Sequence, residues 1–545
     1  MQDNLIRIYT QSFRKHWPLT AFSDFQGSAV TYGQAAQVIR QIHCFFRESG
    51  IRKGDKIAIL GRNSSNWAIS FLAVSGYGAV TVPILPDFYP EDILHILNHS
   101  ESRFLFAADG FLEKLDPEKI NGLRGIVSLT DFSGLYFQST PEKELWEKCF
   151  NAGYAGISSP ENFELDDYSR EDVSIISYTS GTSGYSKGVM IPARSLLSNI
   201  VYAQEYMPLK SGDRIVSFLP MAHVFGLLFE FLFPISVGCH VTFLSKAPTP
   251  QLIIKAFKEI KPALILSVPL VIEKIYKKNI LPVLQKPVVR FLLKVPVIQQ
   301  VLLKKIRASL VETFGGNFHE IVIGGAPLNH EVEDFFRKIE FPFTIGYGMT
   351  ECGPLISYET WSSFRPSSAG RLVDRMEVRI DSMDPFKEVG EILVKGDNIM
   401  LGYYKNEGAT SDAIDSEGWL HTGDLGIIDA NNFIYIRGRC KNMLLGPSGQ
   451  NIYPEEMEAK LNNYPYVLEC VITERDSKMI ALVYPEPEKV EAEKLDKVKL
   501  KEIMAENCRL VNRELPKFAQ LSSIILVEKE FEKTPKRNIK RYLYI

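Results

Sequence analysis

The sequence contains no apolar stretch long enough to cross a bilayer. Its longest apolar run, VFGLLFEFLFPISVG (224–238), is too short and carries Glu230 in its middle. The first residues, MQDNLIRIYT, also lack the uninterrupted apolar core of a secretory signal. We therefore expect a soluble, cytoplasmic protein.

Cysteine and excess charge are scarce as well. The seven cysteines are scattered, odd in number and without a C-x-x-C pair. This argues against a disulfide framework or a zinc site and favours a reducing compartment. The formal net charge is only −3, so the overall charge gives no reason to expect nucleic acid as a partner. With 45% hydrophobic and 23% charged residues, the composition is that of an ordinary globular protein.

Alternating strand and helix patterns cover much of the chain before residue 365. Residues 55–86 combine a β-branched run, a helix opened by Ser and Asn, and a second β-rich run that ends near Pro83. Further short apolar strands and intervening helices are expected at 215–220, 240–244, 251–260, 263–269, 320–327 and 329–339. The alternation predicts layered α/β architecture with largely buried sheets. The length of 545 residues predicts about three to four domain-sized units.

The strand pattern changes after about residue 365. The shorter, more polar runs MEVRI, EILVKG and FIYIRGR predict a β-rich subdomain. Beyond residue 440 we expect a compact α+β unit, with helices at 454–462 and 494–512 and strands at 467–473 and 479–484. No repeat of 20–50 residues and no low-complexity tract is present.

Residues 274–307 are rich in both lysine or arginine and large apolar residues, and they include no acidic residue. Pro282, Pro287 and Pro296 are expected to break the segment into short helices. Two interpretations remain open. The helices either pack their apolar faces on the core, or they form a basic amphipathic patch that touches a membrane or collects an amphiphilic substrate from it.

The stretch YTSGTSGYSKG (178–188) follows one apolar run and precedes another, which predicts a loop between two strands. It matches neither the Walker A loop nor the Rossmann fingerprint. Its glycines can turn backbone N–H groups toward an anion, its hydroxyls are donors, and its lysine adds a positive charge. The alternative is a polar hairpin without a ligand. The candidate phosphate-binding residues are Thr179, Ser180, Gly181, Thr182, Ser183, Gly184, Lys187 and Gly188.

This string closely resembles the signature loop of the adenylate-forming superfamily, YTSGTTGxPKG, which is found in acyl-CoA synthetases, luciferases and the adenylation domains of peptide synthetases. Here Ser183 replaces a threonine and Ser186 replaces the usual proline, and both changes are mild. LPMAHVFG (219–226) resembles the segment whose histidine, His223, lies beside the carboxylate pocket. IGGAPL (323–328) resembles the adenine-lining turn, which implies roles for Gly325, Ala326 and Pro327.

Further motifs follow in the order of the superfamily. YGMTE (347–351) resembles the segment that stacks an aromatic ring on adenine and holds magnesium with a glutamate. WLHTGDLG (419–426) resembles the segment whose aspartate accepts the ribose hydroxyls, and GRCKN (438–442) resembles the hinge. GEILVKG (390–396) resembles a scaffold motif, and GQNIYPEEME (449–458) the start of the C-terminal domain. The residues implied by these matches are Tyr347, Gly348, Thr350, Glu351, Asp424, Arg439 and Lys441.

The resemblance implies a domain plan and a reaction. An N-terminal AMP-binding domain would span residues 1–437, with a β-rich subdomain at about 365–437, and a hinge at 438–441 would lead to a small mobile C-terminal domain at 442–545. A carboxylate would attack the α-phosphate of ATP to give an acyl-adenylate, and a thiol would then displace AMP. Residues 179–187 would hold the β- and γ-phosphates, and Glu351 with Thr182 would hold Mg²⁺. Lys187, His223, Glu351 and Lys441 would be catalytic, with Tyr347 on adenine and Asp424 and Arg439 on the ribose.

One C-terminal position departs from the superfamily. The expected pattern is TPxGKIxR, and this chain has EKTPKRNIKR (532–541), which places Asn538 where the adenylation lysine is expected. Asparagine cannot supply a positive charge. A shifted Lys536, Arg537 or Lys540, a charge from a partner, or a slower first half-reaction are the alternatives.

The motifs at 418–424 and 449–458 look most like the long-chain fatty acyl-CoA synthetase branch. We therefore expect a medium- or long-chain fatty acid as substrate and ATP, Mg²⁺ and coenzyme A as cofactors. Because no carrier-protein domain follows residue 545, a peptide synthetase is disfavoured. An acyl-AMP ligase that loads a separate acyl carrier protein, and a non-catalytic nucleotide- or acyl-binding relative, remain as alternatives.

Overall fold

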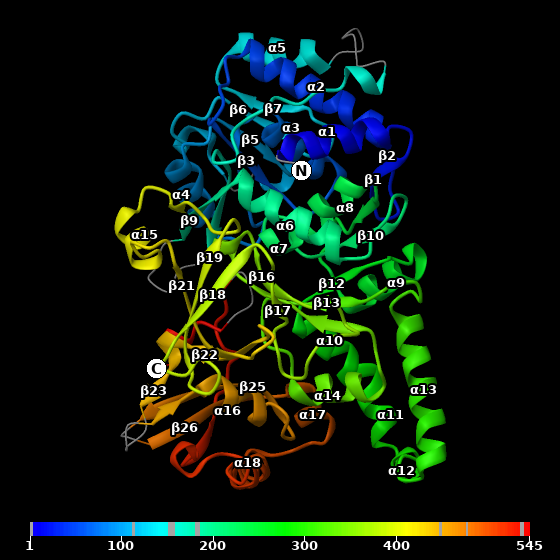
Figure 1. Cartoon of the computed structure of the whole chain (residues 1–545), viewed down its shortest axis with the longest axis vertical. Coiled ribbons are helices and arrows are strands. Elements are labelled where there is room, and N and C mark those ends of the chain that lie inside the picture. Colours follow the sequence, from blue (N-terminus) through cyan, green and yellow to red (C-terminus); the bar gives the residue numbers. More distant parts are fainter. Residues whose placement is uncertain are drawn as a thin grey trace.

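The computed structural model describes residues 4–111, 115–150, 159–179, 186–445, 450–475, 478–534 and 539–544. The molecule is elongated, with the N-terminal α/β layers at the top of Figure 1 and the C-terminal α+β unit at the bottom. This mixed architecture of several sheets and surrounding helices confirms the α/β fold class.

The largest sheet has eight strands in the order β20-β9-β8-β4-β3-β5-β6-β7. Strands β3 to β6 pair in parallel, β8 is parallel to β4, and β8–β9, β9–β20 and β6–β7 are antiparallel pairs. Their bounds are β3 Lys56–Leu60, β4 Val80–Ile84, β5 Phe104–Ala107, β6 Gly125–Ser128, β7 Gly134–Phe137, β8 Val173–Thr179, β9 Lys187–Pro192 and β20 Gly402–Tyr403.

Both faces of this sheet are buried, as its near-continuous apolar strands predict. Along β3, Ile57 and Ile59 join one hydrophobic cluster while Ala58 and Leu60 join another, because successive side chains of a strand point to opposite faces. The covering helices are α2 (Tyr32–Glu48), α3 (Ser65–Gly76) and α5 (Thr140–Phe150) on the first face and α4 (Pro90–Ser100) on the second.

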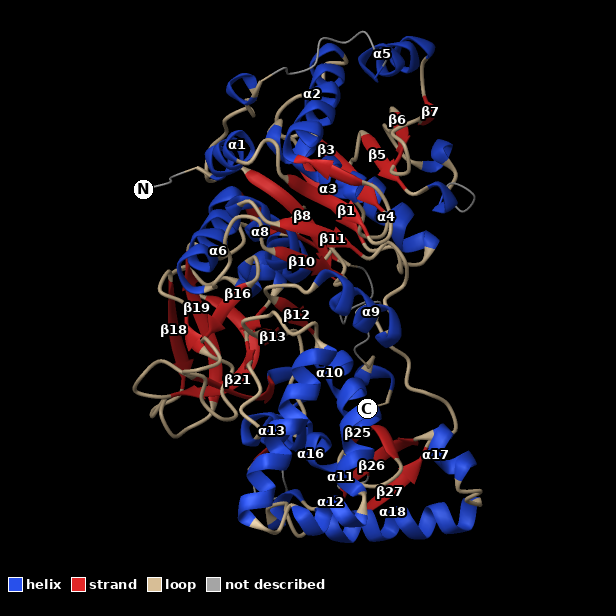
Figure 2. Ribbon diagram, turned by 90° about the vertical axis from the view of Figure 1, so that its right-hand side faces the viewer, coloured by secondary structure: helices blue, strands red, loops and turns tan. Residues whose placement is uncertain are grey.

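Two further sheets complete the α/β layers, which Figure 2 shows as strands set between helices. The first has the order β10-β11-β1-β2, and the second is the parallel set β12-β13-β14. The apolar run 224–238 forms α7, a π-helix (Leu227–Leu232) and α8, and most of it is buried in the core. The strand bounds are β1 Thr20–Asp24, β2 Ala29–Thr31, β10 Arg214–Ser217, β11 His240–Phe243, β12 Ile265–Ser267, β13 Ile321–Ile323 and β14 Phe343–Ile345. The helices around these two sheets are α1 Leu5–Lys15, α6 Ala193–Tyr206, α7 Val224–Gly226, α8 Phe233–Val237, α9 Pro250–Ile260, α10 Pro269–Ile275 and α14 His330–Lys338.

The proline-rich segment forms α11 (Leu281–Gln285), α12 (Pro287–Leu292) and α13 (Pro296–Thr313). A proline stands at the first or second position of each helix, which confirms that the three prolines divide the segment. The expectation of short helices holds for α11 and α12 but is wrong for α13, which continues for 18 residues because no proline follows Pro296 within it. We refer to residues 281–302 as the helical arm. It forms the lower right edge of the molecule in Figure 1.

Short antiparallel strands follow residue 346. They form the sheets β15-β16-β17 and β18-β19-β21-β22, with the short helix α15 (Glu407–Ala413). Their bounds are β15 Tyr347–Gly348, β16 Leu355–Tyr358, β17 Arg371–Leu372, β18 Met376–Asp381, β19 Gly390–Gly396, β21 Leu420–Ile428 and β22 Ile434–Arg439.

The C-terminal unit has its own hydrophobic cluster between the sheet β25-β26-β27 and its helices. Its predicted strands and first helix are confirmed, but the predicted helix 494–512 begins only at Lys497. Asp496 caps that helix by accepting the N–H of Lys499 at 2.7 Å, and Lys494 has a left-handed φ of 51°. The bounds are β23 Leu444–Leu445, β24 Asn451–Ile452, α16 Pro454–Leu461, β25 Val467–Arg475, β26 Lys478–Pro485, α17 Pro487–Ala492, α18 Lys497–Val511 and β27 Ser523–Leu526.

Candidate active site

The signature loop connects the antiparallel strands β8 and β9, which confirms the predicted strand–loop–strand arrangement. Thr179, the last residue of β8, lies opposite Lys187, the first residue of β9. Both side chains are half-buried at the ends of the hairpin. Gly188 follows Lys187 on β9, opposite Tyr178. Five predicted members of the loop lie outside the described residues: Ser180, Gly181, Thr182, Ser183 and Gly184.

Lys187 and Glu351 both contact Tyr403. The Lys187 Nζ atom lies 4.8 Å from the centroid of the Tyr403 ring, and the Tyr403 hydroxyl donates to Glu351 Oε1 at 3.0 Å. Burial and the charge of Glu351 raise the pKa of Tyr403, so its hydroxyl remains protonated and can donate. One tyrosine therefore touches both the cation assigned to phosphate and the carboxylate assigned to magnesium.

Strand β20 explains how Tyr403 reaches this position. Gly402 and Tyr403 pair with Met190 and Val189 of β9. Because β9 starts with Lys187, this pairing places Tyr403 close to Lys187. The N–H of Tyr404 donates to the carbonyl of Gly188 at 2.8 Å, and the N–H of Met400 donates to the carbonyl of Glu351 at 2.8 Å. The sequence gave no motif for Tyr403, because a two-residue strand has no periodicity that could mark it.

Asp424 has a partner on each carboxylate oxygen. The Tyr347 hydroxyl donates to Oδ2 at 2.7 Å, and Arg439 Nε lies 2.9 Å from Oδ1. Asp424 and Arg439 face each other across β21 and β22, which places the pair. The Asp424 side chain is only 6% exposed, whereas that of Arg439 is 62% exposed. The pair thus presents a buried acceptor beside a cation that reaches solvent.

The protonation of Asp424 depends on these neighbours. Burial raises its pKa, while the Arg439 charge and the Tyr347 hydroxyl act in the opposite direction. Glu351 adds to the increase, so the two carboxylates are within electrostatic reach of each other. The structure therefore brings the carboxylates of Glu351 and Asp424 near each other.

The predicted adenine turn lies at the carboxyl edge of the parallel sheet β12-β13-β14. Gly325, with a φ of 85°, Ala326 and Pro327 follow β13 and are exposed. Tyr347 follows β14, the neighbouring strand, and Gly346 donates its N–H to the carbonyl of Ile323 at 2.9 Å. Ligands of open α/β sheets bind at this edge.

Gly348 and Thr350 shape the segment between Tyr347 and Glu351. A side chain at Gly348 would collide with the carbonyl of Pro354, so glycine is required there. Thr350 is buried and opens the short helical turn that carries Glu351.

His223 lies at the start of α7, where its Nδ1 accepts the N–H of Phe225 at 3.3 Å. Phe225 approaches the adenine turn, since a Cβ added at Gly324 would be 3.2 Å from Phe225 Cζ. Asn63 donates to the carbonyl of Leu219 at 2.7 Å and accepts the N–H of Met221 at 3.0 Å. Asn63, which the sequence did not single out, therefore holds the backbone that leads to His223.

Glu230 binds the backbone of the same segment. It is fully buried and accepts the N–H groups of Phe218 and Leu219, each at 3.0 Å. Burial raises the pKa of its carboxyl. The acidic residue that interrupts the apolar run 224–238 thus accepts hydrogen bonds from the backbone.

The predicted hinge, residues 438–441, begins within β22, which ends at Arg439. Lys441 lies on a short helical turn (Cys440–Asn442) and is exposed. Asn538, Lys536 and Arg537 lie outside the described residues. Lys540, the remaining candidate for the missing lysine, pairs with Glu532 at 3.6 Å.

No cluster of three or more potential metal ligands occurs in the part of the chain that the structure describes. Glu351 alone nevertheless fits Mg²⁺, which proteins often hold with one or two carboxylates plus substrate phosphates. None of the helices among the described residues is long and apolar enough to cross a membrane.

Comparison with known families covers nearly the whole chain. The sequence model of the AMP-binding enzyme family matches residues 10–404, and that of the AMP-binding enzyme C-terminal domain matches residues 442–545. Long-chain-fatty-acid–CoA ligase FadD15 of Mycobacterium bovis is 28% identical over 490 residues, which cover 85% of this chain and 78% of that protein. 4-Coumarate:CoA ligase 1 of Petunia hybrida is 28% identical over 463 residues, covering 81% of this chain and 76% of the relative.

Solved structures share the fold. The anthranilate CoA ligase AuaEII in complex with anthranoyl-AMP superposes with a TM-score of 0.80 at 20% identity, covering 99% of this chain and 96% of that one. O-succinylbenzoate CoA synthetase (MenE) of Bacillus subtilis in complex with ATP and magnesium gives a TM-score of 0.74 at 20% identity, covering 98% of both chains.

Proposed function

The chain belongs to the AMP-binding enzyme family, and we propose that it is an ATP-dependent ligase that joins a medium- or long-chain fatty acid to coenzyme A through an acyl-adenylate. A carboxylate oxygen of the acid attacks the α-phosphorus of ATP, and pyrophosphate leaves. The thiol sulfur of coenzyme A then attacks the acyl carbon, its proton passes to solvent, and AMP leaves.

The contact of Lys187 and Glu351 with Tyr403, beside the Asp424–Arg439 pair, is the observation that best supports this proposal. The reaction brings two anions together, so positive charge and fixed polar groups are what a catalyst must supply. Lys187 counters the charge of the β- and γ-phosphates. Arg439 adds a second cation, and Asp424 accepts the ribose hydroxyls.

The remaining residues position the substrates. Tyr347 and the turn Gly325–Pro327 form the adenine subsite, with Gly348 and Thr350 shaping its floor. His223 lies beside the carboxylate of the acid, and Lys441 marks the pivot of the C-terminal domain. Glu351, with Thr182, would hold Mg²⁺, which neutralises phosphate charge when bound.

The fatty-acid assignment is supported by FadD15, which matches over 85% of this chain, and by the motifs at 418–424 and 449–458. The 4-coumarate ligases are similarly related, so an aromatic acid must be tested beside the fatty acids.

The test is ATP–pyrophosphate exchange with octanoate, palmitate, 4-coumarate and anthranilate, followed by AMP release on addition of coenzyme A. Exchange with the fatty acids, and release that depends on coenzyme A, are expected. Exchange only with an aromatic acid would overturn the substrate assignment. Exchange without release by coenzyme A would point to a carrier-protein acceptor, and no exchange with any acid would point to a binding protein. Lys187→Met and Glu351→Gln should each abolish exchange.

A further inference from the structure

The helical arm exposes large apolar side chains that a soluble surface normally hides. Helices α11 and α12 contain no buried residue, and in the 18-residue helix α13 only Leu310 is buried. Phe291 and Val288 are each 68% exposed and Val297 is 77% exposed. Val283, Ile298 and Val301 on the same arm are also exposed. Several large apolar side chains exposed on one segment favour a binding surface.

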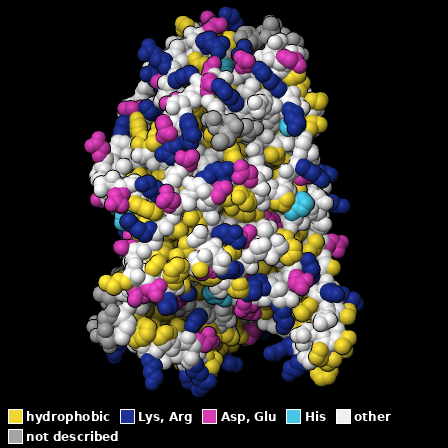
Figure 3. Space-filling model, in the orientation of Figure 1, with side chains coloured by type: hydrophobic (Ala, Val, Ile, Leu, Met, Phe, Trp, Pro, Cys, Tyr) yellow, Lys and Arg dark blue, Asp and Glu magenta, His cyan; other side chains and the backbone are white. Residues whose placement is uncertain are grey.

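Positive charge surrounds these apolar side chains. Residues 274–307 contain nine lysines and arginines and no aspartate or glutamate. On the arm itself, Lys286, Arg290 and Lys294 are exposed, and none of them forms an ion pair with a carboxylate in the described ranges. Figure 3 shows hydrophobic and basic side chains together at the lower right corner of the molecule, over the arm.

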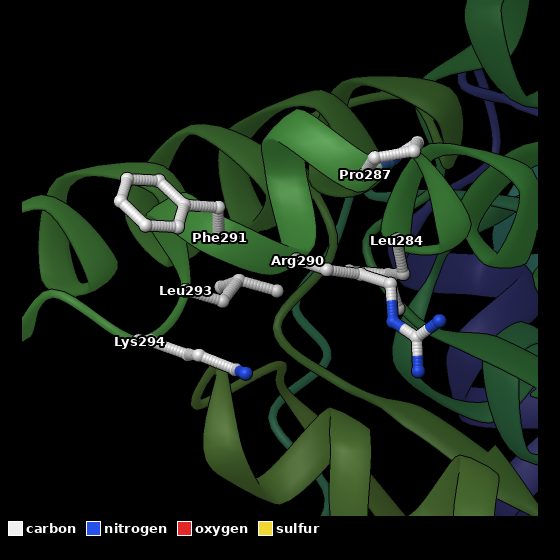
Figure 4. Close-up of a pocket in the computed structure, with 6 residues that line it drawn as sticks. All are labelled: Leu284, Pro287, Arg290, Phe291, Leu293 and Lys294. Atoms are coloured by element: carbon white, nitrogen blue, oxygen red, sulfur yellow. The ribbon is translucent and has the colours of Figure 1, made fainter.

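The arm is also hollowed. An open hollow of about 550 Å³ is lined by Leu284, Pro287, Arg290, Phe291, Leu293 and Lys294. Figure 4 shows Arg290 and Lys294 among the residues that line this hollow, with both charged ends in the lower half of the view. Apolar walls beside two cations suit a molecule that has an acyl chain and an anionic head group.

We propose that the helical arm binds the surface of an anionic phospholipid bilayer. The apolar side chains of α12 and the start of α13 enter the interface, and the cations contact lipid phosphates, as in other basic amphipathic helices. A second copy of this chain fits less well, because a twofold contact would set Lys286, Arg290 and Lys294 against the same cations of the partner. The inference does not depend on the acid that the enzyme activates.

The test is co-sedimentation of the full chain with vesicles, without ATP or acid. Vesicles of phosphatidylcholine alone are compared with vesicles in which about a third of the lipid is phosphatidylglycerol. Binding to the anionic vesicles, little binding to the neutral ones, and weakening at high salt are expected. Because no substrate is present, the vesicle assay is independent of the ligase proposal. Absence of vesicle binding would leave the proposed activity intact, and a protein without ligase activity could still bind the vesicles.

Matched variants separate charge from apolar insertion. Arg290→Gln with Lys294→Gln should lower the partition onto anionic vesicles about fivefold per charge removed. Lys143→Gln with Lys148→Gln is the control, since it removes the same charge from exposed residues of α5 at the opposite end of Figure 1. Phe291→Ser with Val288→Ser should also reduce binding, and the high exposure of both residues means that folding is preserved.

Three results of the vesicle assay would overturn the proposal. They are equal binding to neutral and anionic vesicles or to neither, loss of binding in the α5 control as large as in the arm variant, and a Phe291 and Val288 variant that binds like the wild type. A concentration-dependent dimer that the arm variants abolish would assign the surface to a second copy instead. Pyrophosphate exchange with octanoate, a soluble acid, should be unchanged in all arm variants, since none of these residues belongs to the proposed catalytic site.

Discussion

Removing the hydroxyl of Tyr403 is the sharpest test of the site. In Tyr403→Phe, Glu351 Oε1 loses the donor that lies 3.0 Å away, while the ring that contacts Lys187 remains. A hydrogen bond to a charged group contributes about 1.5–3 kcal/mol. If this bond orients Glu351 in the transition state, its loss lowers kcat/KM for adenylation by about 10- to 100-fold.

Pyrophosphate exchange measured as a function of Mg²⁺ and ATP distinguishes the two contacts of Tyr403. Tyr403→Phe should raise the Mg²⁺ concentration that gives half-maximal rate, with little change in KM for ATP. Tyr403→Leu also removes the ring beneath Lys187, a contact worth about 0.5–2 kcal/mol, and should raise KM for ATP in addition.

The neighbouring tyrosine supplies the control. Tyr404 donates to Glu101 Oε2 at 3.2 Å, and its ring contacts Lys56 and Lys405 rather than Lys187. Tyr404→Phe should therefore leave Mg²⁺ dependence unchanged. Equal kinetics for the wild type, Tyr403→Phe and Tyr404→Phe, with all three folded by circular dichroism, would refute the role assigned to Tyr403.

Three further predictions concern protonation, stability and the C-terminal segment. Burial raises the pKa of Asp424, and the hydrogen bond from the Tyr347 hydroxyl lowers it. Tyr347→Phe should therefore shift the acid limb of the pH profile of kcat/KM for ATP to higher pH. An unshifted limb would contradict the coupling of Tyr347 to Asp424. Burial raises the pKa of Glu458 to about 7 although Arg541 pairs with it. Arg541→Met should therefore destabilise the C-terminal unit by about 3–5 kcal/mol at pH 8, and by less below pH 7, where Glu458 takes up a proton. Urea melts that show the same loss of stability at pH 8 and below pH 7 would exclude this. Asn538→Lys should speed pyrophosphate exchange, whereas an unchanged rate combined with loss of exchange in Lys540→Ala would show that Lys540 supplies the charge.

Much of the fold could be predicted because apolar periodicity determines where long elements form. The strands at 467–473 and 479–484 and the helix at 454–462 were found within two residues. The start of α18 was predicted three residues too early, because it depends on the capping of the helix by Asp496 rather than on the apolar pattern.

Some residues that the motifs marked are brought together by the structure. Asp424, Arg439 and Tyr347 were each assigned from separate segments, and the structure places them in contact. Tyr403 and Asn63 were missed, because each acts through strand pairing or backbone hydrogen bonds between segments distant in sequence. Such contacts leave no local pattern.

Strand β20 has a consequence for how the protein can be divided. It lies in the chain between β19 and β21, yet it forms an edge of the eight-stranded sheet. A fragment that ended near residue 365 would retain β9 but lose its neighbour, which would leave the backbone N–H and C=O groups of β9 open to another chain. The β-rich region is therefore not a separable module, and a shortened protein cut there should aggregate instead of retaining ATP binding.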